Sequence, residues 1–340
     1  MHPMPGRPLP GPSCDLLVLG ELNADVVADC GDTLPAFGQA EQLLDRAALT
    51  LGSSGAITAS AAAALGLRVA FAGVVGDDPL GTFVLDELAA RGVDVSACRR
   101  LPGRATGMTV VLNRTGGDRA LLTFPGTIPD LAVADVPGHL LDGARHVHVS
   151  SYYLQDALRP GLPALFATLA ARGATTSLDP GWDPSGTWDH GLADALRAVR
   201  WLLPNDQELR HIAAAQTGTP GTADPDALLR AVTALGPGIA AKLGATGAAV
   251  LDRPATAGGT GAAGRVTVTP VTPVDTTGAG DNFNAGFIAG LLDGADPHDA
   301  LARAAACGSV SVLGFGGTGR HAGPAEAAAL AADLPRTPLR

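Results

Sequence analysis

The chain has 340 residues, of which 46% are apolar and 16% charged, and this length suffices for one large α/β domain or two small ones with a sizeable core. The formal net charge is -10 and the basic residues form no cluster, so nucleic acid is a poor partner, because phosphate contacts need concentrated positive charge. The Pro-rich residues 1–13, expected to form a flexible tail, lack the apolar run of a signal peptide, and no run of about eighteen apolar residues follows them. We therefore expect a globular cytoplasmic protein that binds small molecules and does not enter a membrane.

Short β-rich runs alternate with helical patterns along the chain. The expected strands lie at 14–20, 68–75, 146–150, 175–179, 200–204 and 238–244, and the expected helices at 55–66, 79–91, 157–172, 205–214, 224–235, 279–293 and 297–313. This alternation is typical of βαβ units. It predicts an α/β fold with a mostly parallel central sheet flanked by helices.

Two stretches, 24–51 and 98–124, break the alternation. The second contains GMTVVLN and RALLTF on either side of RTGGD, and both stretches are typical of antiparallel strands, with a Gly-Gly-Asp turn in the second. Ligands of open α/β sheets bind beyond the carboxyl ends of the strands, so a small β-sheet inserted there would act as a lid.

The four cysteines are scattered without a C-x-x-C pair, which argues against a zinc ribbon, a redox motif or a disulfide framework. We expect free thiols, most of them buried, at Cys14, Cys30, Cys98 and Cys307.

The stretch VDTTGAGDNFNAGF, residues 274–287, joins a strand-like segment to a helix-like one. Apolar residues recur at helical spacing after it, so the helix begins at about Ala279. The first-turn N–H groups of a helix lack internal partners, and side chains this small let an anion approach them, which indicates an anion hole at Gly278, Ala279 and Gly280. Asp281 lies in the same turn, where the helix dipole is expected to keep its pKa low.

A carboxylate beside an anion hole fits phosphoryl transfer, in which the amides hold developing charge while the carboxylate accepts a hydroxyl proton. Taken alone, the turn is equally typical of a Gly-rich helix start in any α/β protein. Two other nucleotide-binding motifs are excluded, since there is no G-x-x-x-x-G-K-[ST] and the first strand is followed by G-E-L-N-A-D with a single glycine.

The full stretch D-T-T-G-A-G-D-N-F-N-A-G closely resembles the second signature of the ribokinase-like carbohydrate kinases, and the chain from about 14 to 320 is similar to the family in its order of segments. The resemblance implies a single ribokinase-like domain over 14–330, with the lid formed from about 24–51 and 98–124. It implies Asp281 as the catalytic base and 278–280 as the anion hole. Asn282 stands where the family more often has a smaller residue, and we expect it to tune the pocket without abolishing catalysis.

P-N-D-Q-E, residues 204–208, follows an expected strand. Asn205 and Glu208 share one helix face and by themselves predict an N-cap with a capping box. The segment also resembles the family's N-x-x-E motif, which implies phosphate binding and a Mg²⁺ ion held through water. The two interpretations are compatible, because Mg²⁺ keeps several waters and needs few carboxylates.

K-L-G-A-T-G, residues 242–247, is similar to the family's nucleotide-binding turn, which implies nucleotide contacts at Lys242, Gly244 and Gly247. Lys242 is the single lysine in a chain with 22 arginines. Either the compact ammonium group of a lysine suits this site better than a guanidinium would, or the presence of lysine here is chance.

Polar and Gly-rich positions at 20–25 and 52–56 suit a sugar, whose hydroxyls need several rigidly held partners. Asn23 and Asp25 match positions that sugar-binding members use, and Gly52, Ser53 and Ser54 resemble part of the first family signature. The usual Asn of that signature is Ile57 here, which puts a plain ribose site in doubt.

Further candidates are less specific. Tyr152 or Tyr153 after one strand could pack on a sugar ring, with the core as the alternative, and Asp179 after the next strand is a substrate-side candidate. By resemblance, Gly314–Gly317 with Asp275 and Thr277 implies a monovalent cation site, as for K⁺, with a surface loop as the alternative.

The sequence thus indicates an ATP- and Mg²⁺-dependent kinase acting on a hydroxyl of a small sugar. The segment GSSGAI lacks Lys and Arg, which favours an unphosphorylated sugar, although Arg100, Arg104 or Arg119 in the expected lid could serve a phosphosugar or sugar acid. The alternatives are a nucleoside kinase and a non-catalytic sugar or nucleotide sensor. The resemblance also implies pairing of two copies through the lid.

Overall fold

The computed structural model describes residues 13–115, 119–253 and 261–339. Most of the predicted tail, residues 1–12, and the Gly-Gly-Asp of the predicted turn, residues 116–118, lie outside the described residues. None of the described helices is both long and apolar enough to cross a membrane.

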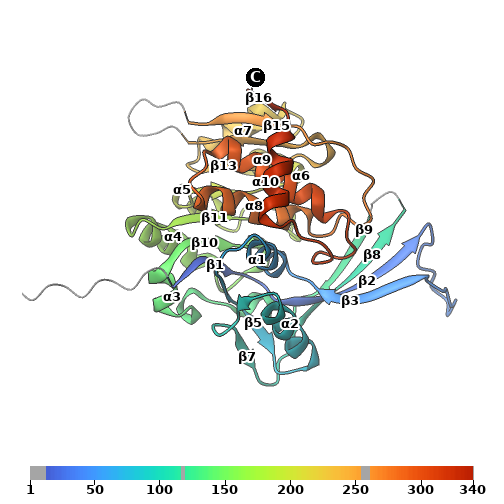
Figure 1. The fold of residues 1–340 in the computed structure, drawn as a ribbon. Helices are drawn as coiled ribbons and strands as arrows, with labels where there is room; N and C mark the ends of the chain where they lie inside the picture. The colour runs from blue at the N-terminus through green and yellow to red at the C-terminus, as the bar shows by residue number, and fades with distance from the viewer. Residues whose placement is uncertain (1–12, 116–118, 254–260, 340) are drawn as a thin grey trace, which may run out of the picture.

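The body of the protein is built on a ten-stranded sheet (Figure 1). Its middle strands pair in parallel, and its β13–β16 edge is antiparallel. In spatial order the strands are β16 (Arg336–Thr337), β15 (Ala263–Val266), β14 (Ala248–Leu251), β13 (Gly238–Lys242), β12 (Trp201–Leu202), β11 (Thr175–Leu178), β10 (Ala144–Val149), β1 (Cys14–Leu19), β4 (Val69–Ala72) and β6 (Val93–Asp94). The predicted mostly parallel sheet is therefore confirmed.

Helices cover both faces of this sheet because its strands are apolar on both sides. In β1, Leu16 and Val18 point to one face and Leu17 and Leu19 to the other. The first face is covered by α1 (Ser54–Ala64), α2 (Pro79–Ala90), α8 (Ala279–Leu292), α9 (Pro297–Ser311) and α10 (Pro324–Asp333). The second face is covered by α3 (Gly138–Gly143), α4 (Leu162–Ala171), α5 (Leu192–Ala198), α6 (Asp206–Thr217) and α7 (Pro225–Thr233).

A separate four-stranded sheet projects from one side of the body, at the right of Figure 1. We call it the lid sheet, and its spatial order is β3 (Arg46–Leu51), β2 (Asn23–Gly31), β8 (Gly107–Arg114) and β9 (Arg119–Phe124). The outer pairs are antiparallel as predicted, but the central pair, β2 with β8, is parallel. The chain between β2 and β8 passes through the body, and a long connection of this kind allows two strands to pair in parallel, whereas a tight hairpin would join antiparallel strands.

The segment 98–124 also does not belong entirely to the lid sheet. Its first part forms β7 (Arg99–Leu101), which pairs in parallel with β5 (Val74–Gly76) in a two-stranded sheet below the body. The Arg100 guanidinium donates a hydrogen bond to the Thr82 hydroxyl, and Arg104 forms an ion pair with Asp130 at 2.7 Å. Both arginines therefore lie outside the lid sheet, which corrects the expectation that they could bind substrate from it.

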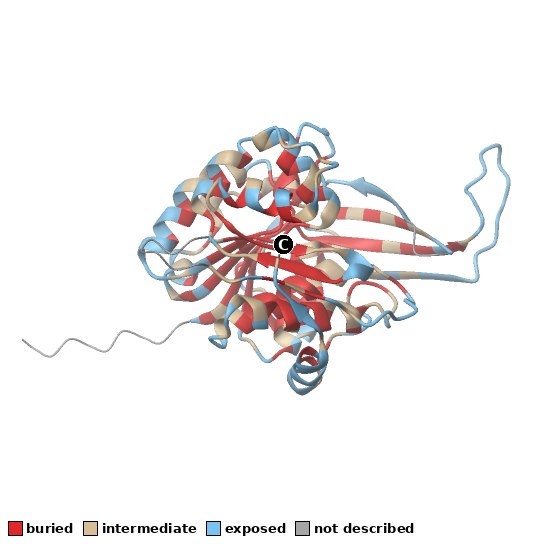
Figure 2. Cartoon of the chain, turned by 90° about the horizontal axis from the view of Figure 1, so that it is seen from above, coloured by how far each residue is buried: buried red, intermediate tan, exposed pale blue. Residues whose placement is uncertain are grey.

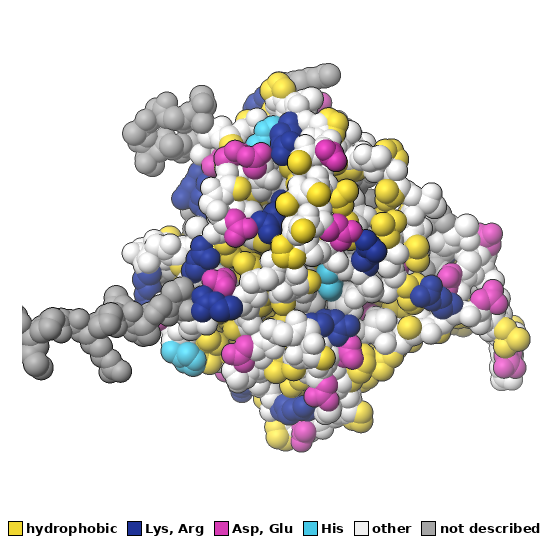
Figure 3. All heavy atoms as spheres, viewed as in Figure 1, with side chains coloured by type: hydrophobic (Ala, Val, Ile, Leu, Met, Phe, Trp, Pro, Cys, Tyr) yellow, Lys and Arg dark blue, Asp and Glu magenta, His cyan; other side chains and the backbone are white. Residues whose placement is uncertain are grey.

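Burial follows this architecture. Figure 2 shows the strands of the central sheet as buried, while the outer end of the lid sheet and its connecting loop are exposed. Figure 3 shows basic and acidic side chains interspersed on the visible face, in keeping with the absence of a basic cluster in the sequence. The four cysteines are free, with Cys98 half-buried and the other three buried.

Helices α8 and α9 pack closely because small residues face each other. A Cβ on Gly290 would stand 2.8 Å from the Cα of Ala300, and one on Gly286 would stand 2.9 Å from the Cα of Ala304. Backbone atoms cannot yield as a flexible side chain can, so these glycines set the separation of the two helices. This packing fixes α8, whose first turn carries Asp281.

We predict that Gly290→Ala lowers the free energy of unfolding by about 1–3 kcal/mol, because the added methyl group meets backbone. Chemical denaturation monitored by circular dichroism measures this. Gly138→Ala is the matched control, since no atom lies within 4 Å of the added Cβ, and it should be neutral or slightly stabilising. Equal destabilisation by both substitutions would contradict the packing argument.

Candidate active site

The helix that begins the site starts where the sequence predicted. Helix α8 begins at Ala279, and its N-cap Gly278 has a left-handed φ of 76°. A Cβ on Gly278 would stand 2.6 Å from the Cα of Gly317, so both conformation and space require glycine here. The Ala279 N–H already donates to Thr276 O at 3.3 Å within the turn. The other N–H groups of the first turn are therefore better placed than that of Ala279 to bind an anion.

Asp281, in the first turn of α8, is half-buried, and its Oδ1 accepts a 2.6 Å hydrogen bond from Ser54 Oγ. Burial, reinforced by the neighbouring Asp179, raises its pKa to about 7. The sequence-based expectation of a low pKa is therefore wrong. The helix dipole does favour the carboxylate, but desolvation and a second buried carboxylate outweigh it.

Lys242 lies in the same cluster, at the end of β13. Its Nζ donates to Asp179 at 2.8 Å and to Asn284 Oδ1 at 3.2 Å, and Asn284 Nδ2 donates to the same Asp179 oxygen at 2.7 Å. Burial alone would lower the pKa of Lys242, but Asp179 and Glu208 outweigh burial and raise it. A Cβ on Gly280 would stand 3.5 Å from Nζ, so the ammonium group lies directly beside the predicted anion hole.

The capping box predicted at 205–208 is present. Asn205 Oδ1 accepts from the Glu208 N–H at 2.9 Å, and the Glu208 carboxyl accepts from the Asn205 N–H at 2.8 Å and from Nδ2 at 2.7 Å. Burial and the nearby Asp179 raise the pKa of Glu208 to about 8. Asn205 also pairs with Lys242 through an isolated parallel β-bridge, so this helix start lies beside β13.

The two glycines of the 242–247 turn, Gly244 and Gly247, have different roles. Gly247 has φ of 105° and packs directly on the carbonyl of Val266, so it is needed for the turn into β14. Gly244 has φ of 60° and no atom within 4 Å of an added Cβ, so its backbone borders open space. Of the two, only Gly244 is open to a ligand.

The predicted sugar-side residues lie together at the junction of the lid sheet and the body. Asn23 Nδ2 donates to Asp25 Oδ1 at 2.8 Å and to Thr109 Oγ1 at 3.3 Å. A Cβ on Gly52 would collide with both Asn23 and Asp25, so glycine is required there. Burial raises the pKa of Asp25 to about 7, although Arg119 opposes the shift.

Ser53 and Ser54 begin α1 and contribute differently. Ser53 has an unusual positive φ of 69°, caps the helix through the Ala56 N–H and donates to Glu21 O at 2.5 Å. Ser54 points instead to Asp281. The turn thus connects the sugar side of the site to the predicted base.

Glu21 is a site neighbour that sequence reasoning missed. Its buried carboxyl accepts from Ser150 at 2.8 Å, from Ser151 at 2.9 Å and from the Gly55 N–H at 3.4 Å. Burial raises its pKa. The position of Glu21, two residues before Asn23 at the end of β1, was the available signal. Asn284 was also missed, although it lies three residues after Asp281 and so shares a helix face with it.

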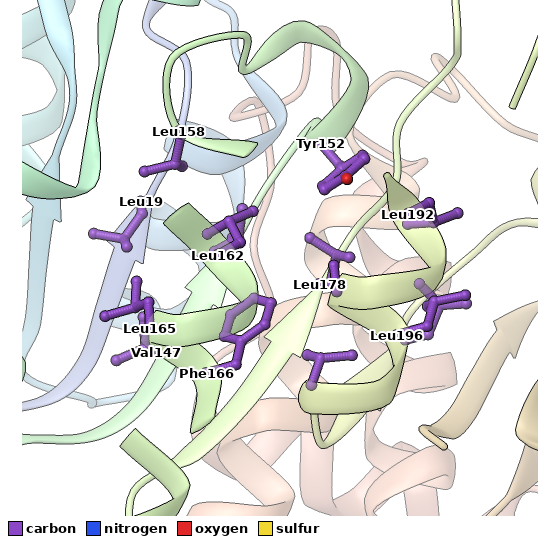
Figure 4. Close-up of a cluster of buried hydrophobic side chains, with 14 of the residues drawn as sticks. Leu19, Val147, Tyr152, Leu158, Leu162, Leu165, Phe166, Leu178, Leu192 and Leu196 are labelled. Atoms are coloured by element: carbon purple, nitrogen blue, oxygen red, sulfur yellow. The ribbon is translucent and has the colours of Figure 1, made fainter. Parts of the chain in front are cut away.

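Tyr152 does not reach the sugar side. It is 1% exposed, packs in the cluster of Figure 4 with residues such as Leu178 and Leu192, and donates to the carbonyl of His190 at 3.0 Å. The prediction that it packs on a sugar ring is therefore wrong. The alternative, a core aromatic after a strand, holds. Asp179 is likewise not free for a sugar hydroxyl, because Lys242 and Asn284 bind its carboxylate.

Asn282 turns away from the pocket. Its Nδ2 donates to Gly278 O at 2.9 Å, and its Oδ1 pairs with His321 Nδ1 at 2.8 Å. Any effect of this residue on the pocket is therefore indirect, through the loop at 317–321 that it ties to α8. Nearby, a Cβ on Gly317 would collide with the side chain of Ile57, so only glycine fits at position 317.

The side chains proposed for a monovalent cation already have protein partners. Asp275 accepts from the Thr277 N–H at 2.8 Å, from the Gly316 N–H at 2.9 Å and from Asn113 at 3.4 Å, and Thr277 Oγ1 accepts from Arg119 at 3.1 Å. Asn113 and Arg119 belong to the lid sheet, so the lid sheet contacts the loop that leads into α8. These hydrogen bonds hold Asp275 and Thr277 in place, and the monovalent cation site at these residues stays a prediction.

Comparison with known proteins agrees with this geometry. Residues 14–320 match the family model described as pfkB family carbohydrate kinase. The chain belongs to the PfkB family of carbohydrate kinases. It is a phosphotransferase that acts on sugar hydroxyls, as this family does.

Two PfkB relatives illustrate the range of substrates. The chain is 32% identical over 301 residues to an ATP-dependent ribose-1-phosphate kinase of Halopiger xanaduensis, covering 87% of this chain and 91% of that one. It is 30% identical over 260 residues to a 2-dehydro-3-deoxygluconokinase of Bacillus subtilis, covering 74% and 76%. Among solved structures, Arabidopsis thaliana ribokinase complexed with ribose and ATP superposes with a TM-score of 0.75 at 24% identity, covering 94% and 99%, which supports the ribokinase-like fold.

The raised pKa of Asp281 predicts how catalysis depends on pH. The sequence predicts Asp281 as the general base, and a general base must be deprotonated, so kcat/KM should fall as the pH drops below about 7. Ser54→Ala removes a hydrogen bond that lowers this pKa, so the inflection should move to higher pH.

The profile is measured as kcat/KM between pH 5.5 and pH 9 in buffers of constant ionic strength. Thr58→Val is the matched control, because the Thr58 hydroxyl donates to the backbone carbonyl of Asp281 and not to its carboxyl. An inflection that stays in place in Ser54→Ala would contradict the assignment of the pKa to Asp281.

Proposed function

We propose that this protein transfers the terminal phosphoryl group of ATP to a hydroxyl of a small sugar, with Asp281 as general base. The observation that carries the proposal is the placement of the Asp281 carboxyl in the first turn of α8, where Ser54 donates a 2.6 Å hydrogen bond to it and the Lys242 ammonium lies beside Gly280. Burial raises the pKa of this carboxyl to about 7. A base poised near neutral pH can accept a proton in the transition state and return it afterwards.

The chain supplies stabilisation for the moving group beside that base. The N–H groups of the N-cap Gly278 and of Gly280 in the first turn of α8 would donate to phosphoryl oxygens, and the Lys242 ammonium would add positive charge next to them. Asp179 and Asn284 hold Lys242 in place. Ser54 orients the Asp281 carboxyl toward the acceptor hydroxyl.

Mg²⁺ fits the charge balance of this cluster. Asp179, Glu208 and Asp281 are three carboxyl groups within electrostatic reach of one another, and the Lys242 ammonium lowers the pKa of each. Within the described residues no three His, Cys, Asp or Glu side chains could hold an ion by themselves, which suits a hydrated ion brought with the nucleotide. Glu208 would hold it through water, and when bound it would neutralise charge on the transferring phosphoryl group.

On the acceptor side, Asn23 and Asp25 would bind sugar hydroxyls, with Gly52 leaving room for the ring. The relatives act on ribose 1-phosphate, 2-dehydro-3-deoxygluconate, ribose and fructose, so we propose a monosaccharide or a simple derivative of one. We derive no step from K⁺, because the side chains of Asp275 and Thr277 are engaged. Since ATP is the donor, we place the reaction in the cytoplasm.

The lid sheet would exclude water from the transfer, since hydrolysis of ATP competes in an open site. It would also join two copies of the chain. Its edge strand β9 exposes Leu121, Leu122 and Phe124, and exposed apolar side chains on a sheet edge favour coverage by a second molecule.

We predict that Asp281→Asn lowers kcat by roughly a thousandfold, because the proton acceptor is lost while the fold and the amides remain. Coupled measurement of ADP release tests the rate, and calorimetry with ATP and Mg²⁺ should find the affinity nearly unchanged. Asp299→Asn is the control, since Asp299 lies in the first turn of α9 but is exposed. If Asp281→Asn turns over as fast as the parent, Asp281 is not the base.

For Glu208→Gln we predict a higher Mg²⁺ requirement with the fold intact. Glutamine at N3 can still accept a hydrogen bond in the capping box, but it cannot ionise, whereas Mg²⁺ held through water would favour the ionised carboxylate of Glu208. The measurement is kcat against free Mg²⁺ at saturating ATP and sugar. An unchanged titration curve would leave Glu208 with its capping role alone.

A further inference from the structure

We propose that His321 is a positioning residue for phosphoryl transfer: through the side-chain amide of Asn282, it fixes the peptide group at the start of α8 beside which the transferring phosphoryl group would bind. This role rests on the function proposed above, since it concerns how the anion hole is held in place. His321 lies in the connection between α9 and α10, and the sequence pattern gives it no place in the site.

Asn282 joins the start of α8 to that connection. Its side chain is 1% exposed, and its Nδ2 donates to Gly278 O at 2.9 Å and to Gly317 O at 3.5 Å. The Gly278 carbonyl also accepts from the backbone N–H of Asn282 at 2.9 Å. Asn282 therefore holds the peptide group between Gly278 and Ala279 through both its backbone and its side chain.

These contacts allow only one orientation of the Asn282 amide. Carbonyl oxygens accept hydrogen bonds and cannot donate them, so Nδ2 and not Oδ1 must face Gly278 and Gly317. Oδ1 then lies 2.8 Å from His321 Nδ1, and because Oδ1 also only accepts, Nδ1 must carry the ring proton. Without that donor the amide could turn over, and Oδ1 would then repel the Gly278 carbonyl.

The surroundings of His321 keep the ring in this form. Its other nitrogen, Nε2, is buried and has no hydrogen-bond partner in the described part of the chain, so a second ring proton would have no acceptor. Burial, assisted by the positive charge of Arg91, lowers the pKa of His321 to about 4. The ring is therefore neutral at physiological pH, and its single proton on Nδ1 stays available to Asn282.

The peptide group that Asn282 holds lies between the proposed phosphoryl donors. The Gly278 N–H precedes it, the Gly280 N–H follows it, and Asp281 comes next in the same turn. Rotation of this peptide group would turn the donors away from the position of the phosphoryl oxygens. Donors of this kind act mainly on charge that develops in the transition state, so we expect their misplacement to lower kcat and to leave substrate binding nearly unchanged.

The test measures kcat and KM for the parent, Asn282→Ala, His321→Leu and the double variant. The acceptor is the one that the parent phosphorylates fastest among ribose, fructose, ribose 1-phosphate and 2-dehydro-3-deoxygluconate. Each single variant should lower kcat about tenfold, with KM for ATP within about twofold of the parent. The double variant should be no slower than Asn282→Ala, because His321 acts through that amide. Losses that multiply in the double variant overturn the inference, and so does parental kcat in Asn282→Ala.

Rescue by a second donor separates positioning from a purely structural role. His321→Asn places an amide N–H at the atom that corresponds to Nδ1, so it should restore most of kcat, although its smaller side chain should lower the Tm below that of the parent. Thr318→Val is the control in the same connection, because the Thr318 hydroxyl accepts from Arg91 at 3.3 Å and should leave kcat unchanged. A folded His321→Asn that is as slow as His321→Leu would overturn the positioning role.

Hydrogen exchange separates a failure of this role from a failure of the proposed function. Exchange in peptides that cover 278–287 reports on the start of α8 without turnover. It should be faster in Asn282→Ala and His321→Leu than in the parent, and unchanged in Thr318→Val. If the parent phosphorylates no acceptor while exchange responds in this way, the kinase assignment for these acceptors fails and the positioning of the α8 start stands. Parental exchange rates in both variants would contradict the role of His321.

Discussion

The structure depends most on the balance between buried carboxyl groups and the single lysine at the end of β13. Asp179, Glu208 and Asp281 come from three separate elements, and Lys242 bonds directly to Asp179 alone. Burial and the neighbouring Asp179 raise the pKa values of Glu208 and Asp281 toward neutrality, and Lys242 offsets only part of that rise. The cluster therefore has a deficit of positive charge that a nucleotide-bound metal ion would offset.

That balance explains why one residue can act as a base near neutral pH. A carboxylate at an exposed helix start would be fully ionised and too weak a base to accept a proton effectively. Burial beside Asp179 raises the pKa of Asp281 to about 7, while the bond from Ser54 limits the rise. Sequence alone supplied the helix start but not this environment, because Asp179 lies about a hundred residues away in the chain.

The fold and the site were predictable to different degrees. Alternating apolar runs predicted the central strands and the start of α8, since these depend on local pattern. The parallel pairing of β2 with β8 and the location of Arg100 outside the lid sheet depend on long-range topology, which local pattern does not encode. Tyr152 illustrates the same limit: its type and position suit either a sugar ring or the core, and only packing against Leu178 and Leu192 decides.

The contact of Ile57 with Gly317 has a mechanical consequence. Helix α1 carries Ser54 and contacts the 314–317 loop through Ile57. In this loop the Gly316 N–H donates a hydrogen bond to the Asp275 carboxylate, and the Phe315 ring centroid lies 3.5 Å from the guanidinium carbon of Arg46 in the lid sheet. With an isoleucine side chain filling the gap at Gly317, α1 and this loop have no space in which to approach or slide. We therefore expect α1 and the 314–317 loop to stay in register when a ligand enters, and any movement of the lid sheet to come from bending of its strands where they leave the body.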